Sequence, residues 1–83
     1  ATEVVALKYD GRSSAPEVVA KGQDLLALRI REIAAEAGVP IVPDPPLARS
    51  LHGSVEVGQQ IPEELFQAVA QILAYVYRVA GRR

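Results

Sequence analysis

The hydrophobic pattern of the chain changes at Asp24, from short β-branched runs to side chains repeated at helical spacing. Residues 3–9 form the first run, and both of its faces are mainly apolar, which indicates a strand covered on both sides or nearly so. Residues 17–21 form a second short run that ends at Gly22. Two strands are therefore expected before the first helix.

The pattern that begins at Asp24 predicts an amphipathic helix that ends at Gly38. The side chain of Gln23 or Asp24 is expected to accept backbone N–H bonds at its start, and Gly38 to supply the left-handed conformation at its end. The residues on its apolar face are Leu26, Ile30, Ile33, Ala34 and Ala37.

Prolines mark the next two elements. Residues 39–43 are too rich in proline for a helix and predict a third strand, joined to the second through the helix by a right-handed crossover and parallel to it. Asp44, followed by two prolines, is typical of a helix N-terminus and predicts a short helix through residues 47–51 that Gly53 stops.

The longest helix is expected from Pro62 onward, after a connector at residues 55–60. Glu63 and Glu64 would lie at the positive end of its dipole, and Arg78 near the negative end. Its apolar stripe comprises Leu65, Val69, Ile72, Leu73, Val76 and Ala80. The expected fold class is α/β, a small mixed β-sheet of about three strands packed with about three helices, in the order β-β-α-β-α-α.

Composition narrows the function classes. The 83 residues carry 9 basic and 10 acidic side chains, a net charge of −1, so a nucleic-acid partner is not expected. Without cysteine there is no disulfide framework, thiolate metal site or cysteine nucleophile, and neither a cofactor nor a metal is expected. A chain of this length supports one domain, residues 1–83. The longest uncharged stretch, residues 65–77, is too short to cross a bilayer as a helix.

No set of side chains in the sequence suggests catalysis. His52 is the only imidazole, and the serine two residues earlier faces elsewhere on a helix, so a surface histidine near a helix C-terminus is the favoured interpretation. Glu63 and Glu64 are adjacent, hence about 100° apart on a helix, and favour a helix-dipole role over an acid/base pair. Lys21–Gly22 lacks the flanking glycines and the following hydroxyl of a phosphate loop. The residues indicate a non-enzymatic binding or structural module.

Six sequence motifs lie in order along nearly the whole chain. They are found at residues 5–9, 15–22, 28–34, 38–42, 45–51 and 57–65. Together they resemble the C-terminal cytoplasmic domain of the FlhB/YscU/SpaS family. Six motifs in sequence are far more specific than any single one, so the chain is identified as a member of this family.

The resemblance implies a non-enzymatic component or accessory of the flagellar or type III protein export apparatus. Such a module would recognise export substrates or other apparatus proteins and contribute to substrate-specificity switching. The implied location is cytoplasmic, at the inner face of the membrane with the apparatus, and contact with the membrane is indirect. The alternative is a small protein-binding adaptor or regulator outside secretion that retains the fold.

Members of the family cut themselves at an Asn-Pro-Thr-His motif directly before the first strand. In this sequence the positions of the family's Thr, His and next residue fall on Ala1, Thr2 and Glu3, so the motif is not present in the chain. Self-cleavage by asparagine cyclisation is therefore not expected. An N-terminal alanine is what removal of an initiator methionine leaves, which favours a stand-alone short homologue over a fragment of a longer exporter.

The resemblance also predicts an open sheet edge. In the family the first strand lies before the cleavage motif, so residues 3–9 or a neighbouring strand would lack a partner for backbone N–H and C=O groups. Self-association through strand pairing or swapping, or capture of a partner's strand, is expected.

The resemblance implies a small apolar pocket that binds a substrate or partner, formed by the Ala-Pro that opens the second strand and by the last helix. Matching motif to motif places this site at Ala15, Pro16, Ala70 and Leu73. Ala70 and Leu73 are spaced i, i+3 and share a helix face, where a small residue beside a larger one leaves a dent for an apolar anchor. The alternative is that both only pack the core beside Val69.

Overall fold

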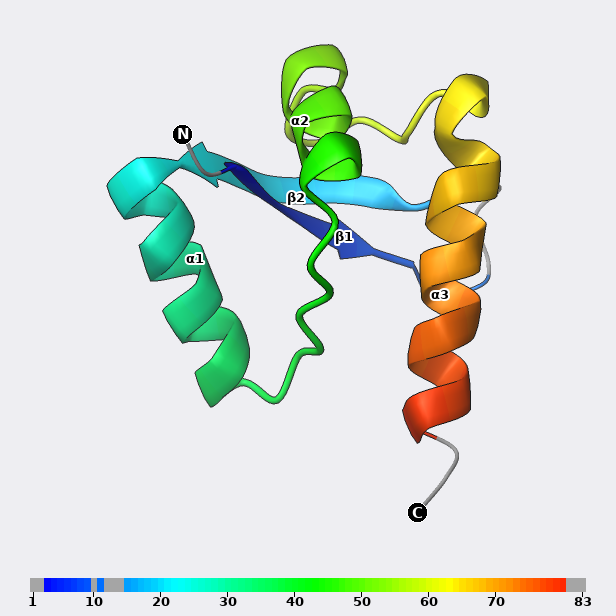
Figure 1. The fold of residues 1–83 in the computed structure, drawn as a ribbon. Coiled ribbons are helices and arrows are strands. Elements are labelled where there is room, and N and C mark those ends of the chain that lie inside the picture. Colours follow the sequence, from blue (N-terminus) through cyan, green and yellow to red (C-terminus); the bar gives the residue numbers. More distant parts are fainter. Residues whose placement is uncertain (1–2, 10, 12–14, 81–83) are drawn as a thin grey trace.

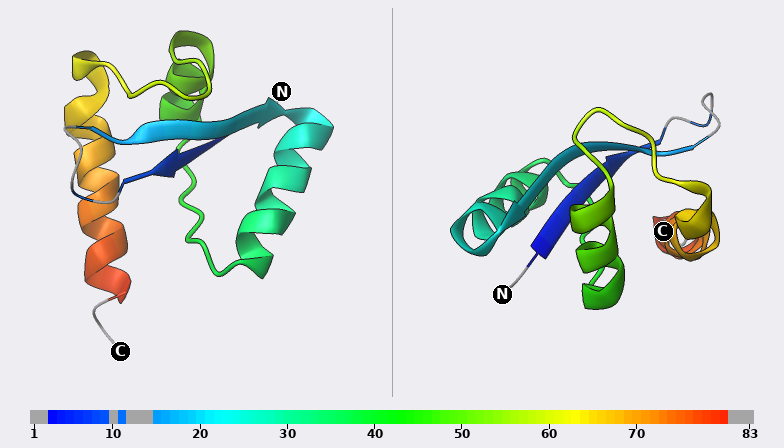
Figure 2. Two further views of the ribbon diagram at one scale, coloured as in Figure 1. Left: turned by 180° about the vertical axis from the view of Figure 1, so that it is seen from behind. Right: turned by 90° about the horizontal axis from the view of Figure 1, so that it is seen from above.

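In the residues that the structure describes (3–9, 11 and 15–80), the computed structural model shows a two-stranded sheet and three α-helices (Figure 1). The elements are β1 (Glu3–Lys8), β2 (Glu17–Gln23), α1 (Asp24–Glu36), α2 (Pro45–Ser54), the short 3₁₀ helix η1 (Glu63–Leu65) and α3 (Phe66–Ala80). Helices α2 and α3 lie on one face of the sheet, whereas α1 lies at the other end of the sheet and packs toward the opposite face (Figures 1 and 2). The expected mixed α/β class is confirmed.

The two strands pair antiparallel over their full lengths. Ala6 pairs with Ala20, whereas the next residue, Leu7, pairs with Val18. Val19 is therefore an extra residue on β2, and the register shifts at this point. Such a bulge increases the local twist of a strand pair. The shift leaves Val18 fully buried and Val19 exposed.

Gly22 lies inside β2, which continues one residue beyond it to Gln23 rather than ending before it. A Cβ atom at Gly22 would lie 2.6 Å from Cγ of Leu26, closer than real contacts allow. A residue without a side chain therefore lets the first turn of α1 approach the strand.

The third strand predicted at residues 39–43 is not formed. This segment runs as unpaired chain between α1 and α2 (Figure 1). Pro40 and Pro43 have no N–H to offer a neighbouring strand, and the N–H of Val39 donates to the carbonyl of Ala34 at the end of α1, at 2.9 Å. The described sheet therefore has two strands in place of about three, and the predicted crossover and parallel pairing are wrong.

Helix α1 has nearly the predicted bounds, but it buries a narrower face. Gly38 adopts the expected left-handed conformation at φ +75°, whereas Gln23 at the N-cap makes no side-chain capping bond. Leu26 and Ile33, expected in the core, are about half exposed, and Ala27 is the buried residue of the helix. A sheet of two strands is too narrow to cover the whole apolar face of a helix laid across its end.

Helix α2 begins as predicted. Asp44 accepts the backbone N–H of Leu47 with its Oδ1 atom at 3.3 Å, and two prolines occupy the first helical positions. The helix does not stop at Gly53, because the N–H of Val55 still donates to the carbonyl of Leu51 at 3.0 Å.

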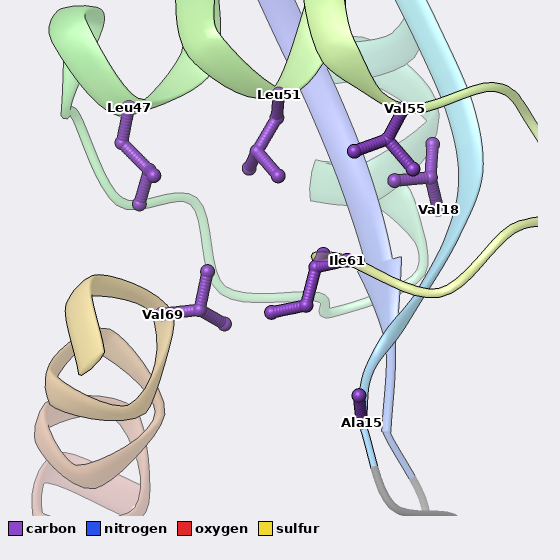
Figure 3. Packing of buried hydrophobic residues seen from close by; sticks show 7 residues of the cluster. All are labelled: Ala15, Val18, Leu47, Leu51, Val55, Ile61 and Val69. Carbon is purple, nitrogen blue, oxygen red and sulfur yellow. The ribbon is translucent and has the colours of Figure 1, made fainter. Parts of the chain in front are cut away.

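The core is a single apolar cluster where α2, β2 and α3 meet (Figure 3). From α2, Leu51 extends toward Ile61 and Leu47 toward Val69, which enters from α3 (Figure 3). The predicted stripe of α3 is confirmed for Val69, which is buried, and for its neighbours Leu65, Ile72 and Leu73, which pack against the cluster. The buried members are Ala15, Val18, Leu47, Leu51, Val55, Ile61 and Val69.

The connector after α2 closes the outer edge of β2 at its start. The N–H of Val18 donates to the carbonyl of Gln59 at 2.9 Å, and the N–H of Gly58 donates to the carbonyl of Val18 at 2.7 Å. An isolated antiparallel bridge joins Glu17 to Gln60. This edge is therefore already paired where β2 approaches α3.

Candidate protein-binding site

An apolar groove of about 350 Å³ runs along one flank of α3, between this helix and the segments that lead out of β1 and into β2. We call it the α3 groove. It is lined by Tyr9, Pro16, Ile61, Phe66, Val69, Ala70, Leu73, Ala74 and Tyr77.

The helix wall of the α3 groove arises from the spacing of apolar residues. Phe66, Ala70, Leu73 and Tyr77 follow one another at intervals of four, three and four residues, so they share one face of α3. Ala70 and Ala74 are small, while Phe66 and Tyr77 are bulky. The wall is therefore low in the middle and raised at both ends.

The floor of the α3 groove is rigidly built. Pro16, Ile61 and Val69 are buried, and the carbonyl of Pro16 accepts the N–H of Ile61 at 3.0 Å. The floor thus belongs to the core, whereas the C-terminal half of α3 extends beyond the sheet (Figure 1). Tyr77, in that half, is more than half exposed.

Three of the four residues assigned to the site from the sequence meet in the α3 groove. Pro16, Ala70 and Leu73 line it, and Ala70 is exposed rather than packed in the core. Leu73 also packs against the core cluster, so it contributes both to the core and to the α3 groove. Ala15 is 2 % exposed, belongs to the core and does not line the groove. It borders the site through its neighbour Pro16.

The site predicted from the sequence included none of the three aromatic residues of the lining, Tyr9, Phe66 and Tyr77. The spacing of Phe66 and Tyr77 with Ala70 and Leu73 is a signal that could have identified two of them. Tyr9 could not be found this way, because it follows β1 and is distant from α3 along the chain.

The lining of the α3 groove contains no charged side chain. Among the described residues there is also no group of three His, Asp or Glu side chains that could hold a metal ion. The groove can bury apolar surface, and two of its lining residues, the exposed Tyr9 and Tyr77, carry hydroxyl groups. Its chemistry is that of binding.

Lys21, considered above as part of a phosphate loop, has a structural partner instead. Its Nζ atom donates to the carbonyls of His52 and Val55, each at 2.9 Å, at the C-terminal end of α2. Glu56 lies 3.9 Å from the same nitrogen. A cation bound to the negative end of a helix stabilises that end, so this lysine joins β2 to α2.

Comparison with known proteins settles the family. Residues 3–76 match the family described as FlhB HrpN YscU SpaS. The chain belongs to this family. No described helix of the chain is long and apolar enough to cross a membrane.

Several curated relatives are flagellar proteins. The chain is 58% identical over 76 residues to the flagellar biosynthetic protein FlhB of Escherichia coli, a match that covers 90% of this chain and 20% of the relative. With the protein of the same name from Bacillus subtilis it shares 55% identity over 75 residues, covering 89% of this chain and 21% of the relative. The chain thus spans about a fifth of the length of these relatives.

Solved structures show the same fold. The cytoplasmic domain of FlhB from Shewanella putrefaciens superposes with a TM-score of 0.89 at 51% identity, covering 94% of this chain and 64% of that one. The PscU C-terminal domain superposes with a TM-score of 0.85 at 39% identity, covering 90% of this chain and 96% of that one.

Proposed function

We propose that residues 1–83 form a single FlhB-like C-terminal cytoplasmic domain of a flagellar or type III protein export apparatus. Its α3 groove would bind export substrates or other apparatus proteins and contribute to substrate-specificity switching. Family membership and the similarity to proteins named flagellar biosynthetic protein FlhB support the proposal. The similarity to a solved cytoplasmic domain of FlhB supports a cytoplasmic location. A position at the inner face of the membrane, with membrane contact only through the apparatus, is part of the proposal. No observation favours an adaptor outside secretion.

One observation carries the binding role, namely that the α3 groove is apolar and yet open to solvent. Phe66, Ala70 and Tyr77 are all exposed along it. Contiguous exposed apolar surface gains free energy when a partner covers it. Because no charged side chain lines the groove, an apolar anchor enters it without desolvating a charge.

Ala70→Asp is expected to abolish capture of export substrates while leaving the fold intact. A bound anchor would bury the new carboxylate unpaired, which costs about 3 kcal/mol and corresponds to a loss of roughly a hundredfold in affinity. Since Ala70 is exposed, the free protein should lose less than about 1 kcal/mol of stability, the difference in helix propensity. Pull-down of export substrates and a thermal melt measure the two effects.

Gln67→Asp is the matched control. Gln67 is exposed on the same helix, one turn earlier, and does not line the α3 groove. The Gln67→Asp variant carries the same added charge as Ala70→Asp but should still capture substrates. Equal loss of capture in both variants would point to charge alone, and a collapsed melting transition in Ala70→Asp would remove Ala70 from the proposed site.

The proposal is non-enzymatic. The 83 residues contain no asparagine, so the cyclisation by which the family cleaves itself has no electrophile within them. Ala1 and Thr2, aligned above with the cleavage motif, lie outside the described residues. An intact-mass spectrum of the native gene product tests whether the protein cleaves itself. A longer precursor that converts spontaneously to a chain starting at Ala1 would contradict the proposal.

We also propose self-association, or capture of a partner's strand, through the free edge of β1. In the described structure β1 pairs with β2 on one side, and no further strand flanks it. Unpaired backbone groups on an edge strand template pairing with another chain. Sedimentation should show mass increasing with concentration, with the amides of β1 protected from hydrogen exchange. A strict monomer with unprotected β1 amides would contradict self-association through this edge.

A further inference from the structure

We infer that the α3 groove takes an amphipathic α-helix, lying antiparallel to α3, and not an extended segment. The inference rests on the proposed binding function of the groove. It adds the backbone conformation of the ligand and the order of its charges.

The first support is the shape of the wall. Phe66, Ala70, Leu73 and Tyr77 repeat at four, three and four residues, the spacing at which side chains of two helices interlock. From Phe66 to Tyr77 the wall is roughly 17 Å long at 1.5 Å per residue, about three turns of a matching helix. Ala70 and Ala74 at its middle let the backbone of a second helix approach closely.

The second support is that the strand edge beside the α3 groove is closed. Pro16 has no N–H, and its carbonyl is occupied by the N–H of Ile61 at 3.0 Å. Glu17 is bridged to Gln60, and both backbone groups of Val18 are bonded to the connector. An extended ligand could not add to β2 here and would bury its own N–H and C=O groups unpaired. A helix satisfies these groups internally.

The third support is the distribution of charge at the two ends of the wall. Glu63 and Glu64 lie at the N-terminal end of α3, and Arg78 lies in its last turn. A helix running antiparallel places its last turn beside the two glutamates and its first turn beside the arginine. Basic residues in the last turn and acidic residues in the first also suit the ligand's own dipole. The favoured ligand is therefore acidic at its start and basic at its end.

Three synthetic 16-residue peptides of identical composition test the inference by calorimetric titration of the wild-type chain. The helical peptide carries leucines at the four-three-four spacing with acidic residues first and basic residues last. The strand peptide alternates the same leucines with polar residues. The reversed peptide keeps the helical spacing and exchanges the two charge blocks.

The helical peptide should bind at least about tenfold more tightly than the strand peptide. In the groove, only the helical peptide has its backbone N–H and C=O groups hydrogen-bonded. Linking two of its solvent-facing side chains by a lactam should tighten binding further by preorganisation. The reversed peptide should bind about threefold more weakly than the helical one, a difference that disappears at 1 M salt. Equal or tighter binding of the strand peptide overturns the helical mode, and equal binding of the reversed peptide overturns the antiparallel orientation.

Two variants show where the peptide binds. Ala70→Asp should abolish binding of the helical peptide, while Tyr75→Asp, on the opposite flank of α3, should retain it. Unchanged binding to Ala70→Asp overturns the inference. If no peptide binds while Ala70→Asp still abolishes capture of export substrates, the helical mode fails and the proposed function stands. If Ala70→Asp leaves that capture unchanged as well, both fail.

Discussion

Leu51→Ala should lower the free energy of unfolding by about 3 kcal/mol, the typical cost of a cavity left by a buried leucine. Leu51 is 3 % exposed and lies in the middle of the core cluster, facing Ile61 from α2 (Figure 3). A domain of this size has few other core residues to absorb the loss. Denaturant unfolding followed by circular dichroism measures the change.

Leu28→Ala is the matched control, because the same atoms are removed from a helix. Leu28 lies on α1 and is 52 % exposed, so its truncation should change stability by less than about 1 kcal/mol. Similar losses in the two variants would mean that Leu28 is as deeply buried as Leu51. That outcome would contradict the burial described here.

Lys21→Met should destabilise the protein by about 3 kcal/mol, since hydrogen bonds to charged groups contribute about 1.5 to 3 kcal/mol each and two are lost. The variant keeps most of the apolar stem but leaves the carbonyls of His52 and Val55 without their donor. The lysine side chain is only 18 % exposed, so water replaces the ammonium group poorly. Thermal and denaturant unfolding should agree on the loss.

Glu56→Gln separates the hydrogen bonds of Lys21 from its ion pair. The carboxylate lies 3.9 Å from Nζ and its side chain is 78 % exposed, and such surface pairs contribute less than about 1 kcal/mol. The variant should therefore be nearly as stable as the wild type. A loss equal to that of Lys21→Met would show that charge pairing, not the capping of α2, stabilises this contact.

Local signals in the sequence determined most of the elements. Asp44 followed by two prolines predicted the start of α2, because a carboxylate acceptor and residues that need no N–H suit a helix N-terminus wherever it lies. Gly38 predicted the end of α1, because only a residue without Cβ readily adopts φ near +75°. The ordered motifs likewise identified the family before the fold was known. Each of these signals depends on neighbours along the chain.

The tertiary structure decided which apolar residues are buried. Residues 39–43 are as apolar as a strand, yet no neighbouring strand pairs with them. Leu26 and Ala70 are both apolar residues on amphipathic helices, and both are exposed, because a sheet of two strands covers only part of each helix. The sequence placed Ala15 and Pro16 together, but the fold turns Ala15 into the core and Pro16 toward the α3 groove. Burial depends on partners that are distant along the chain, which hydrophobic spacing within one segment cannot specify.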